Sequence, residues 1–434
     1  MEPLLVAGCL IVLLFVIMGS GVWIGLSLLG VGWLAMDLFT RRPVGDAMVT
    51  TIWTASSSWT LTALPMFIWM GEILFRSKLS ESMFRGLAPW MTRIPGRLLH
   101  TNVIGCTIFA AVSGSSAATC ATIGKMTIPE LRGRGYPEHL IVGSLAGSGT
   151  LGLLIPPSLI MIVYAVAANV SIAKLFAAGF IPGFLVAGLF AAYVALWSLL
   201  HPQAIPREDK QLSLGAKIHE SRHLLPAVFL ILMVLGSIYA GIATATEAAA
   251  LGVAGALILS AVQGSLTRAT FKQALLGATR LSCMIALILA GASFLTLAMG
   301  FTGLPRALAQ WIDAQDLSPY LLIVVLTVFY IVLGCFLDGI SMVVLTMAVV
   351  LPTIEAAQFD LIWFGIFIVI VVEMAQITPP VGFNLFVLQG MTGHQMPTIA
   401  RAALPFFLLL CLAVALITVF PEIVSFLPRL MVGK

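Results

Sequence analysis

The chain has 434 residues, of which 60% are hydrophobic and only 9% are charged, and its mean hydropathy is +1.09. Soluble proteins carry about 25% charged residues, so this composition excludes a soluble globular protein and indicates a polytopic membrane protein. The formal net charge of +4 is what basic cytoplasmic loops give a membrane protein and does not indicate nucleic-acid binding.

A bilayer-spanning helix needs about 20 mostly apolar residues. Candidate segments lie at 4–18, 21–36, 53–75, 140–170, 175–200, 224–242, 246–265, 281–303, 361–391 and 403–427, with two shorter pairs around 98–129 and 320–352. They fill the chain, so we expect no soluble domain. The first segment has no basic n-region and no small-residue cleavage site, so we expect a span and not a cleaved signal peptide.

The first short pair, 98–129, is flanked on both sides by basic residues. These are Arg76, Lys78, Arg85, Arg93, Arg97, Arg132 and Arg134. Short basic loops stay in the cytoplasm, so both ends of the pair are predicted to be cytoplasmic and the pair to form a re-entrant helical hairpin. It turns at Ser113-Gly114-Ser115-Ser116. Polar backbone at membrane depth needs burial in protein or a wet cavity. Close helix packing is the competing explanation for such small residues.

The broken segment 140–170 supplies the second half of a candidate ion site. Gly149 and Thr150 lead into Pro156-Pro157. Two successive prolines free several carbonyl oxygens, and unwound carbonyls coordinate Na⁺ in transporters with broken helices. A structural kink without an ion is the alternative. The predicted ligands of the first Na⁺ are Ser113, Gly114, Ser115, Gly149, Thr150 and Pro156.

The second half of the chain follows a basic connector at 201–223, which contains Arg207, Lys210, Lys217 and Arg222 and is predicted to be cytoplasmic. Around the second short pair, 320–352, the loop charge reverses. Asp313, Asp316, Glu355 and Asp360 stand against Arg306 alone. A re-entrant hairpin entering from outside is expected, with a turn near Asp338. With the broken segment 361–391, it predicts a second Na⁺ site at Gly339, Ser341, Thr378 and Pro379.

Matched prolines relate the two halves. Pro156-Pro157 and Pro379-Pro380 lie 223 residues apart, and the same offset joins Pro129 to Pro352 and Pro182 to Pro405. Such a repeat indicates an internal duplication. Because the hairpins are predicted to enter from opposite sides, the duplication is predicted to be inverted. The fold class expected is an all-α integral membrane transporter, with repeats at 1–200 and 224–434 joined by 201–223.

Charged residues within apolar segments are functional candidates, because they are costly there. They are Glu72, Lys125, Glu247, Asp338 and Glu373. Asp338, at a hairpin turn whose helix N-terminus can attract an anion, is the favoured site residue. The predicted substrate-binding residues are Ser116, Thr119, Ser158, Asp338 and Asn384. With few fixed cations nearby, weak intrinsic affinity for an anionic substrate is expected.

Other chemistries lack their motifs. The sequence has no Walker A loop, no His-Glu-x-x-His pair and no Gly-x-Ser-x-Gly turn, which argues against an ATP-driven motor and an enzyme. Its six cysteines and six histidines show no metal-ligand spacing. We therefore expect no transition metal and no organic cofactor.

Several motifs together resemble one family over essentially the whole chain. They are Leu64-Pro-Met-Phe-Ile, Gly71-Glu72, Val112-Ser-Gly-Ser-Ser, Ile123-Gly124, Ile128-Pro129, Gly143-Ser-Leu-Ala-Gly-Ser-Gly-Thr-Leu-Gly, Leu154-Ile-Pro-Pro-Ser, Thr246-Glu-Ala-Ala-Ala and Ile377-Thr-Pro-Pro-Val-Gly-Phe-Asn-Leu-Phe-Val. The chain resembles the large membrane subunit of the tripartite ATP-independent periplasmic (TRAP) transporters. Some members carry an acidic residue where this chain has Thr119, so a charged role is not carried over to that position.

The resemblance implies Na⁺-coupled uptake of a small organic acid, often a carboxylate, across the bacterial cytoplasmic membrane. It implies a periplasmic substrate-binding protein, a separate small four-helix membrane subunit, and an elevator in which hairpins and broken helices move against a scaffold. A stand-alone Na⁺/dicarboxylate symporter of similar design is the nearest alternative. A passive channel and a non-transporting structural partner are weaker ones.

Overall fold

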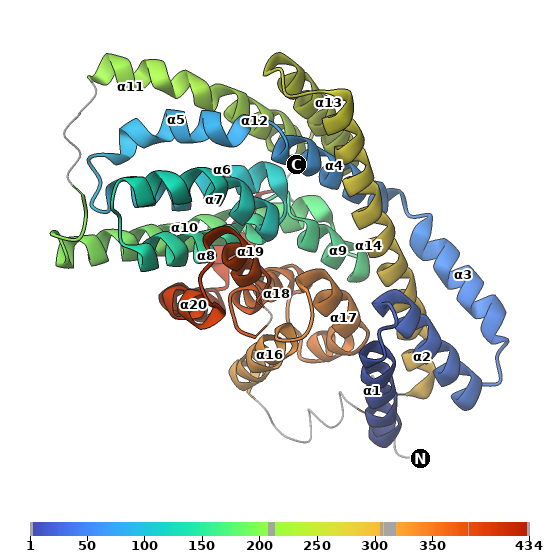
Figure 1. Ribbon diagram of the computed structural model, residues 1–434. Helices are drawn as coiled ribbons and strands as arrows, with labels where there is room; N and C mark the ends of the chain where they lie inside the picture. The colour runs from blue at the N-terminus through green and yellow to red at the C-terminus, as the bar shows by residue number, and fades with distance from the viewer. Residues whose placement is uncertain (1–2, 207–212, 304–306, 308–317, 381, 432–434) are drawn as a thin grey trace.

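The computed structural model describes residues 3–206, 213–303, 307, 318–380 and 382–431, and every regular element within them is helical (Figure 1). Helices are expected here because a bilayer offers no hydrogen-bond partners to the backbone. The first half contains α1 (Pro3–Gly19), α2 (Ile24–Phe39), α3 (Val44–Ser56), η1 (Trp59–Thr62), α4 (Ala63–Phe75), α5 (Leu79–Met91), η2 (Arg97–Leu99), α6 (His100–Ser113), α7 (Ser116–Gly133), α8 (Glu138–Leu154), α9 (Leu159–Ala167) and α10 (Ile172–Leu200).

The remaining helices follow the connector. They are α11 (Leu214–Ser221), η3 (Arg222–Leu224), α12 (Leu225–Tyr239), α13 (Ala245–Val262), α14 (Arg268–Thr302), α16 (Pro319–Gly334), α17 (Gly339–Ala356), α18 (Leu361–Gln376), α19 (Phe383–Thr392), α20 (Met396–Val419) and α21 (Glu422–Leu430). Within the described residues, six helices are long and apolar enough to cross a membrane, or up to eight if each of two bent pairs forms one span. The prediction of a multi-pass membrane protein is confirmed at this level.

Two predicted spans differ from the observed helices. The segment expected at 53–75 is divided at Ser57 and Ser58, and its two parts are bent by 54°. The span expected at 281–303 belongs to a helix that begins thirteen residues earlier, at Arg268. Hydropathy finds only the apolar part of a helix, so the polar first turns of α14 escaped the prediction.

The two predicted hairpins are pairs of short helices joined by tight turns. The first is α6 and α7, with the turn between Ser113 and Ser116; the second is α16 and α17, with the turn between Gly334 and Gly339. With 14 residues, α6 is about 21 Å long, which is shorter than the ~30 Å hydrocarbon core. With 18 residues, α17 is long enough by itself to be a candidate span.

The order of elements after each hairpin is the same in both halves. A helix broken at a Pro-Pro pair follows, as α8 with α9 and as α18 with α19, and then a long helix, α10 or α20. The peptide bonds of both Pro-Pro pairs are cis. Pro129 and Pro352 lie inside α7 and α17, and Pro182 and Pro405 lie inside α10 and α20. The prolines matched by the 223-residue offset therefore occupy matching elements.

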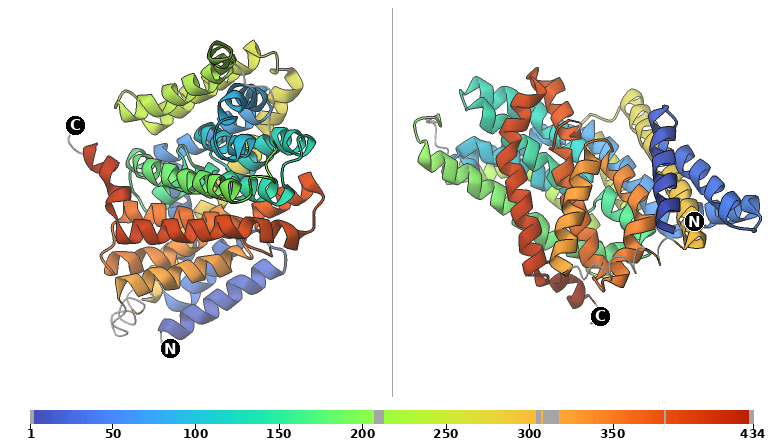
Figure 2. Two further views of the ribbon diagram at one scale, coloured as in Figure 1. Left: turned by 90° about the vertical axis from the view of Figure 1, so that its left-hand side faces the viewer. Right: turned by 90° about the horizontal axis from the view of Figure 1, so that it is seen from below.

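The core lies where the two halves meet. The second-half helices α18 and α20 pack against α8 and α10 of the first half, and α16 packs against α18 (Figure 2). Every residue of α18 from Trp363 to Gln376 is buried. Since α18 touches α8, α10, α16, α17 and α20, it is the central helix of the molecule.

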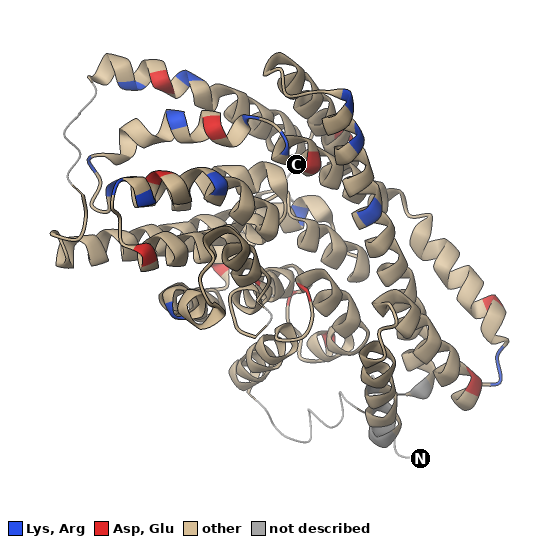
Figure 3. Cartoon of the chain, in the orientation of Figure 1, with Lys and Arg blue, Asp and Glu red and all other residues tan. Residues whose placement is uncertain are grey.

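A group of basic side chains lies away from this centre. Figure 3 shows Lys and Arg on α5, α7 and α11, which pack against one another. This basic group follows the charge pattern from which a cytoplasmic face was predicted. Arg207 and Lys210 of the connector, and Arg306, Asp313 and Asp316 before the second hairpin, lie outside the described residues.

Candidate functional site

The first hairpin turn is shaped by glycine and a serine cap. Gly114 has a φ of +63°, a left-handed conformation that glycine adopts without a steric penalty. Ser115 precedes the first residue of α7, and its hydroxyl accepts a hydrogen bond from the backbone N–H of Ala118 at 3.4 Å. The sequence folds locally as a turn because a serine at this position satisfies one of the free N–H groups of the helix.

This turn rests directly on the break between α8 and α9. The Leu159 N–H donates to the carbonyl oxygen of Gly114 at 3.2 Å. A Cβ atom on Gly152 would lie only 2.5 Å from the carbonyl oxygen of Ser115. Glycine at 152 thus permits a backbone-to-backbone approach that any side chain would prevent. The structure brings Ser113, Gly114 and Ser115 next to the segment that contains Pro156.

Gly149 and Thr150, two further predicted ligands of the first ion, lie in the last turns of α8. Gly149 packs against Cys120 of α7, and the Thr150 hydroxyl donates to the carbonyl oxygen of Gly147 at 2.8 Å. The Ser113 hydroxyl is 2.6 Å from that of Thr119. Oxygen atoms therefore line the contact between turn and break, as a site for a hard cation requires.

The second turn repeats this arrangement with different side chains. Asp338 caps α17, and its carboxylate accepts from the backbone N–H groups of Ile340 and Ser341 at 3.1 and 3.2 Å and from the Ser341 hydroxyl. In the same turn, Cys335 donates from Sγ to the Pro379 carbonyl oxygen at 3.4 Å. Gly339 packs against Val372 of α18. Of the second predicted set, Gly339 and Pro379 therefore lie where the hairpin meets the broken helix. The Ser341 hydroxyl bonds to Asp338 within the turn, and Thr378 donates to the Met374 carbonyl oxygen at 2.6 Å within the broken helix.

Glu373 lies between the two broken helices. Its side chain, on α18, is completely buried and faces the Thr150 side chain and the Leu154 backbone of α8. Neither carboxylate oxygen has the geometry of a hydrogen bond to any described residue. An ionised carboxylate without partners in a protein interior is costly unless a cation or a proton neutralises it. The sequence drew attention to Glu373 as an intramembrane charge but did not place it beside Thr150.

Most of the predicted substrate residues are deeply buried. Ser116, Thr119, Ser158 and Asn384 are each at most 5% exposed. Ser158 caps α9 by accepting from the Met161 N–H, whereas both side-chain polar atoms of Asn384 lack partners among the described residues. Asp338, in contrast, is exposed and lines a cavity whose wall contains none of the other four. The cavity that Asp338 lines therefore does not include the other four predicted substrate residues.

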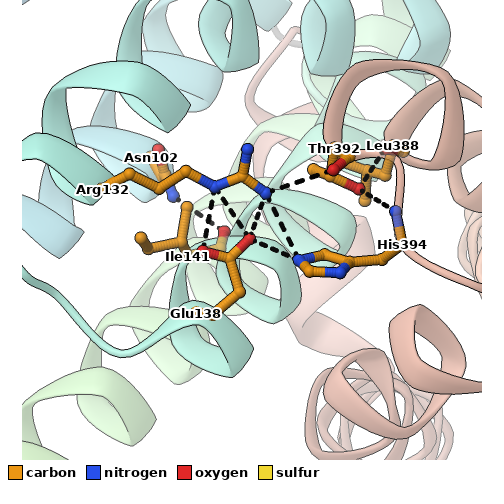
Figure 4. A network of polar contacts seen from close by, with 7 residues as sticks. All are labelled: Asn102, Arg132, Glu138, Ile141, Leu388, Thr392 and His394. Carbon is orange, nitrogen blue, oxygen red and sulfur yellow. Dashed lines mark hydrogen bonds and ion pairs between the residues drawn. The ribbon is translucent and has the colours of Figure 1, made fainter.

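A polar network joins the two halves at one end of the broken helices (Figure 4). Arg132 of α7 pairs with Glu138 at the start of α8, and its Nε is 3.0 Å from both carboxylate oxygens. His394, between α19 and α20, approaches the same carboxylate with its Nε2 at 2.8 Å. This network fastens the first hairpin to the end of the second broken helix.

Paired broken helices and short helical hairpins in a polytopic helical protein are typical of secondary transporters. The model of the "Tripartite ATP-independent periplasmic transporter, DctM component" family matches residues 11–423. The chain therefore belongs to the DctM family of TRAP transporter large membrane components, as its motifs predicted.

Individual relatives are consistent with this assignment. The chain is 31% identical to the C4-dicarboxylate TRAP transporter large permease protein DctM of Rhodobacter capsulatus, over 99% of this chain and 100% of that protein. It is 32% identical to the protein of the same name from Pseudomonas aeruginosa, over 92% of each. The solved structure of the Alcanivorax borkumensis YdaH transporter matches with a TM-score of 0.64 at 14% identity, covering 91% of this chain and 95% of that one, and this likeness concerns the fold alone.

Proposed function

We propose that this protein performs Na⁺-coupled secondary uptake of a small organic acid across the cytoplasmic membrane. The family is one of secondary transporters, and two relatives are named for C4-dicarboxylates. The observation that carries Na⁺ coupling is the buried, unpaired carboxylate of Glu373 beside Thr150 at the first broken helix. A cation bound there neutralises that charge, with further oxygen ligands from the hairpin turn and the break.

Each of the two Na⁺ sites lies where a hairpin turn contacts the break in the helix that follows it. Their ligands are Ser113, Gly114, Ser115, Gly149, Thr150 and Pro156 for the first and Gly339, Ser341, Thr378 and Pro379 for the second. A backbone carbonyl oxygen at each contact, that of Gly114 at the first and that of Pro379 at the second, supports this proposal. Glu373 adds the negative charge at the first site.

The movement that we propose is an elevator. The hairpins α6–α7 and α16–α17 are re-entrant. Together with the broken helices they form a transport domain that moves against a scaffold of outer helices. The two inverted halves of the protein span residues 1–200 and 224–434. The length of α6 and the matching order of elements in the two halves support this. The direct contact between α8 and α18 supports movement of both broken helices as one body.

The partners we propose are a small four-helix membrane subunit and a periplasmic substrate-binding protein that delivers the acid. The name of the family, a tripartite periplasmic transporter, supports both. Proteoliposomes that contain this protein, the small subunit and the loaded binding protein, singly and in combination, test the proposal with the labelled acid. Uptake should require all three together with an inward Na⁺ gradient.

Three results would contradict this function. Rapid saturable uptake of the free acid by this subunit alone would favour a stand-alone Na⁺ symporter. Uptake that is driven by a proton gradient in the absence of Na⁺ would contradict the proposed coupling of transport to Na⁺ at the two cation sites. Movement of the acid only down its own gradient would indicate a channel.

A further inference from the structure

A cavity of about 660 Å³ is lined by the second hairpin turn, by residues at the start of α2 and by α14. Its volume is in the range of about 300–1,000 Å³ that is typical of small-molecule sites. The lining residues used below are Trp23, just before α2; Arg280, Cys283 and Met284 of α14; and Asp338 and Ser341 of the second hairpin. The cavity thus has one wall on the proposed transport domain and one on the outer helices.

Arg280 is the fixed cation of this cavity. It stands twelve residues into the continuous helix α14, about 18 Å along its axis, and its side chain is exposed. Arg280 makes no ion pair or hydrogen bond with any residue that the structure describes. The guanidinium group presents parallel N–H donors that match a carboxylate in a bidentate pair. An unpaired arginine in a cavity is therefore suited to an anionic ligand.

Asp338 places a negative charge on the wall of the cavity that the second hairpin forms. Its exposed carboxylate caps α17 and so counteracts the partial positive charge at the start of that helix. A second anionic group near this wall would be repelled. Carboxylate oxygens accept several hydrogen bonds each, so Asp338 can still accept one from a hydroxyl or ammonium group. Trp23 and Met284 add apolar surface to the cavity.

We propose that this cavity binds the substrate, a small organic acid with one carboxylate held by Arg280 and a hydroxyl or ammonium group held by Asp338. This rests on the proposed function, because it names the class of acid that the transporter carries. It replaces the expectation that fixed cations are scarce near the site. It also departs from the C4-dicarboxylates for which two relatives are named, since the Asp338 carboxylate would repel a second carboxylate of the substrate.

Cys283 in the same cavity provides a direct probe of the charge of Arg280. In the full chain with the other five cysteines replaced by serine, its labelling rate is measured with an anionic sulfonatoethyl and a cationic trimethylammonioethyl methanethiosulfonate. The ratio of anionic to cationic rates should fall roughly fivefold or more in Arg280→Gln, because a unit charge is lost close to the thiol. Arg280→Lys should restore the ratio. Arg268→Gln, at the start of the same helix, should leave it unchanged.

Protection of the same thiol tests the class of substrate. Butanoate, 4-hydroxybutanoate, 4-aminobutanoate and succinate share a four-carbon chain and differ at one end. At millimolar concentration, 4-hydroxybutanoate and 4-aminobutanoate should slow the labelling of Cys283 more than butanoate and succinate do. Arg280→Gln should abolish this protection. Asp338→Asn, which retains a helix-capping side chain, should bring succinate to the level of 4-hydroxybutanoate.

The outcomes are separable from those of the uptake experiment, because labelling needs neither a gradient nor the partner proteins. An unchanged rate ratio in Arg280→Gln would overturn the role of Arg280. Strongest protection by succinate, or no protection by any of the four acids, would overturn the proposed substrate class. Protection without Na⁺-driven uptake would instead leave the cavity assignment standing and contradict the proposed function.

Discussion

Glu373 is the residue on which the proposed coupling depends most. Isolated ionised carboxylates are strongly disfavoured in a protein interior, and Glu373 is fully buried without a hydrogen-bond partner among the described residues. Its place on α18 brings it to Thr150 of α8, so a cation between them would contact both halves of the chain. Binding of Na⁺ would then favour the close association of the two broken helices.

Glu373→Gln keeps the shape of the side chain and removes its charge. The Na⁺ concentration that gives half-maximal uptake should rise about a hundredfold or more, because loss of one partner of a buried ion pair costs about 3–5 kcal/mol. The measurement is initial uptake against Na⁺ concentration in the reconstituted system. As a matched control, Glu247→Gln changes an exposed residue that caps α13, and its Na⁺ dependence should equal that of the unmodified protein. Equal Na⁺ dependence of both variants would disprove the role of Glu373.

The sequence revealed the individual charges but not their neighbours. Glu373 was visible as an acid within an apolar run, and such a run does not say which other helix its side chain will face. Arg280 was missed because the apolar segment begins at the next residue, although α14 itself begins at Arg268. Each of these outcomes depends on tertiary packing, which a single apolar pattern does not specify.

At the scale of elements, the contact of the first hairpin with α8 depends on small residues. Gly152 lets the Ser115 carbonyl oxygen approach the α8 backbone, where an added Cβ would lie at 2.5 Å. The breaks themselves were predictable, since consecutive prolines end a helix whatever surrounds them. The turns at Ser113–Ser116 and near Asp338 were also found from the sequence, because glycine and capping side chains favour them locally.

Gly152→Ala should force the hairpin turn away from α8. We expect a loss of about 1–3 kcal/mol of stability, typical of overpacking, and a corresponding fall in Na⁺-driven uptake. Thermal unfolding of the purified protein in detergent measures the first effect. Gly188→Ala on α10 is the control, because no atom lies within 4 Å of the added Cβ, and alanine favours a helix. If both variants unfold at the same temperature, the close approach at Gly152 is not important for stability.

For the whole molecule, the inverted relation of the two halves remains a prediction from loop charge. The basic group on α5, α7 and α11 and the acidic residues Glu355 and Asp360, at and beyond the end of α17, are its main support, together with the matched prolines. The network of Arg132, Glu138 and His394 belongs to the basic end of the molecule, and it joins positions more than 250 residues apart.

Single cysteines test this topology after the native thiols are replaced. Arg85→Cys, on α5, should react only with reagents that reach the cytoplasm, whereas Glu355→Cys, in the last turn of α17, should react from outside. Both residues are exposed, and neither caps a helix. The measurement is labelling by a membrane-impermeant maleimide in intact cells and in inverted vesicles. Reaction of both cysteines from the same side would rule out the inverted repeat.

The central position of α18 has a consequence for how the protein is made. The ribosome synthesises α8, α9 and α10 well before α18, so the residues that pack around Glu373 in the finished protein lack this partner helix until α18 is inserted. A chain that ends at residue 357 contains the whole first half and would still lack its centre. We expect cells to degrade such a truncated chain rapidly, and pulse-chase labelling would measure its lifetime against that of the full chain. Insertion of this one late helix would then decide whether the quality-control proteases of the membrane degrade the chain or spare it.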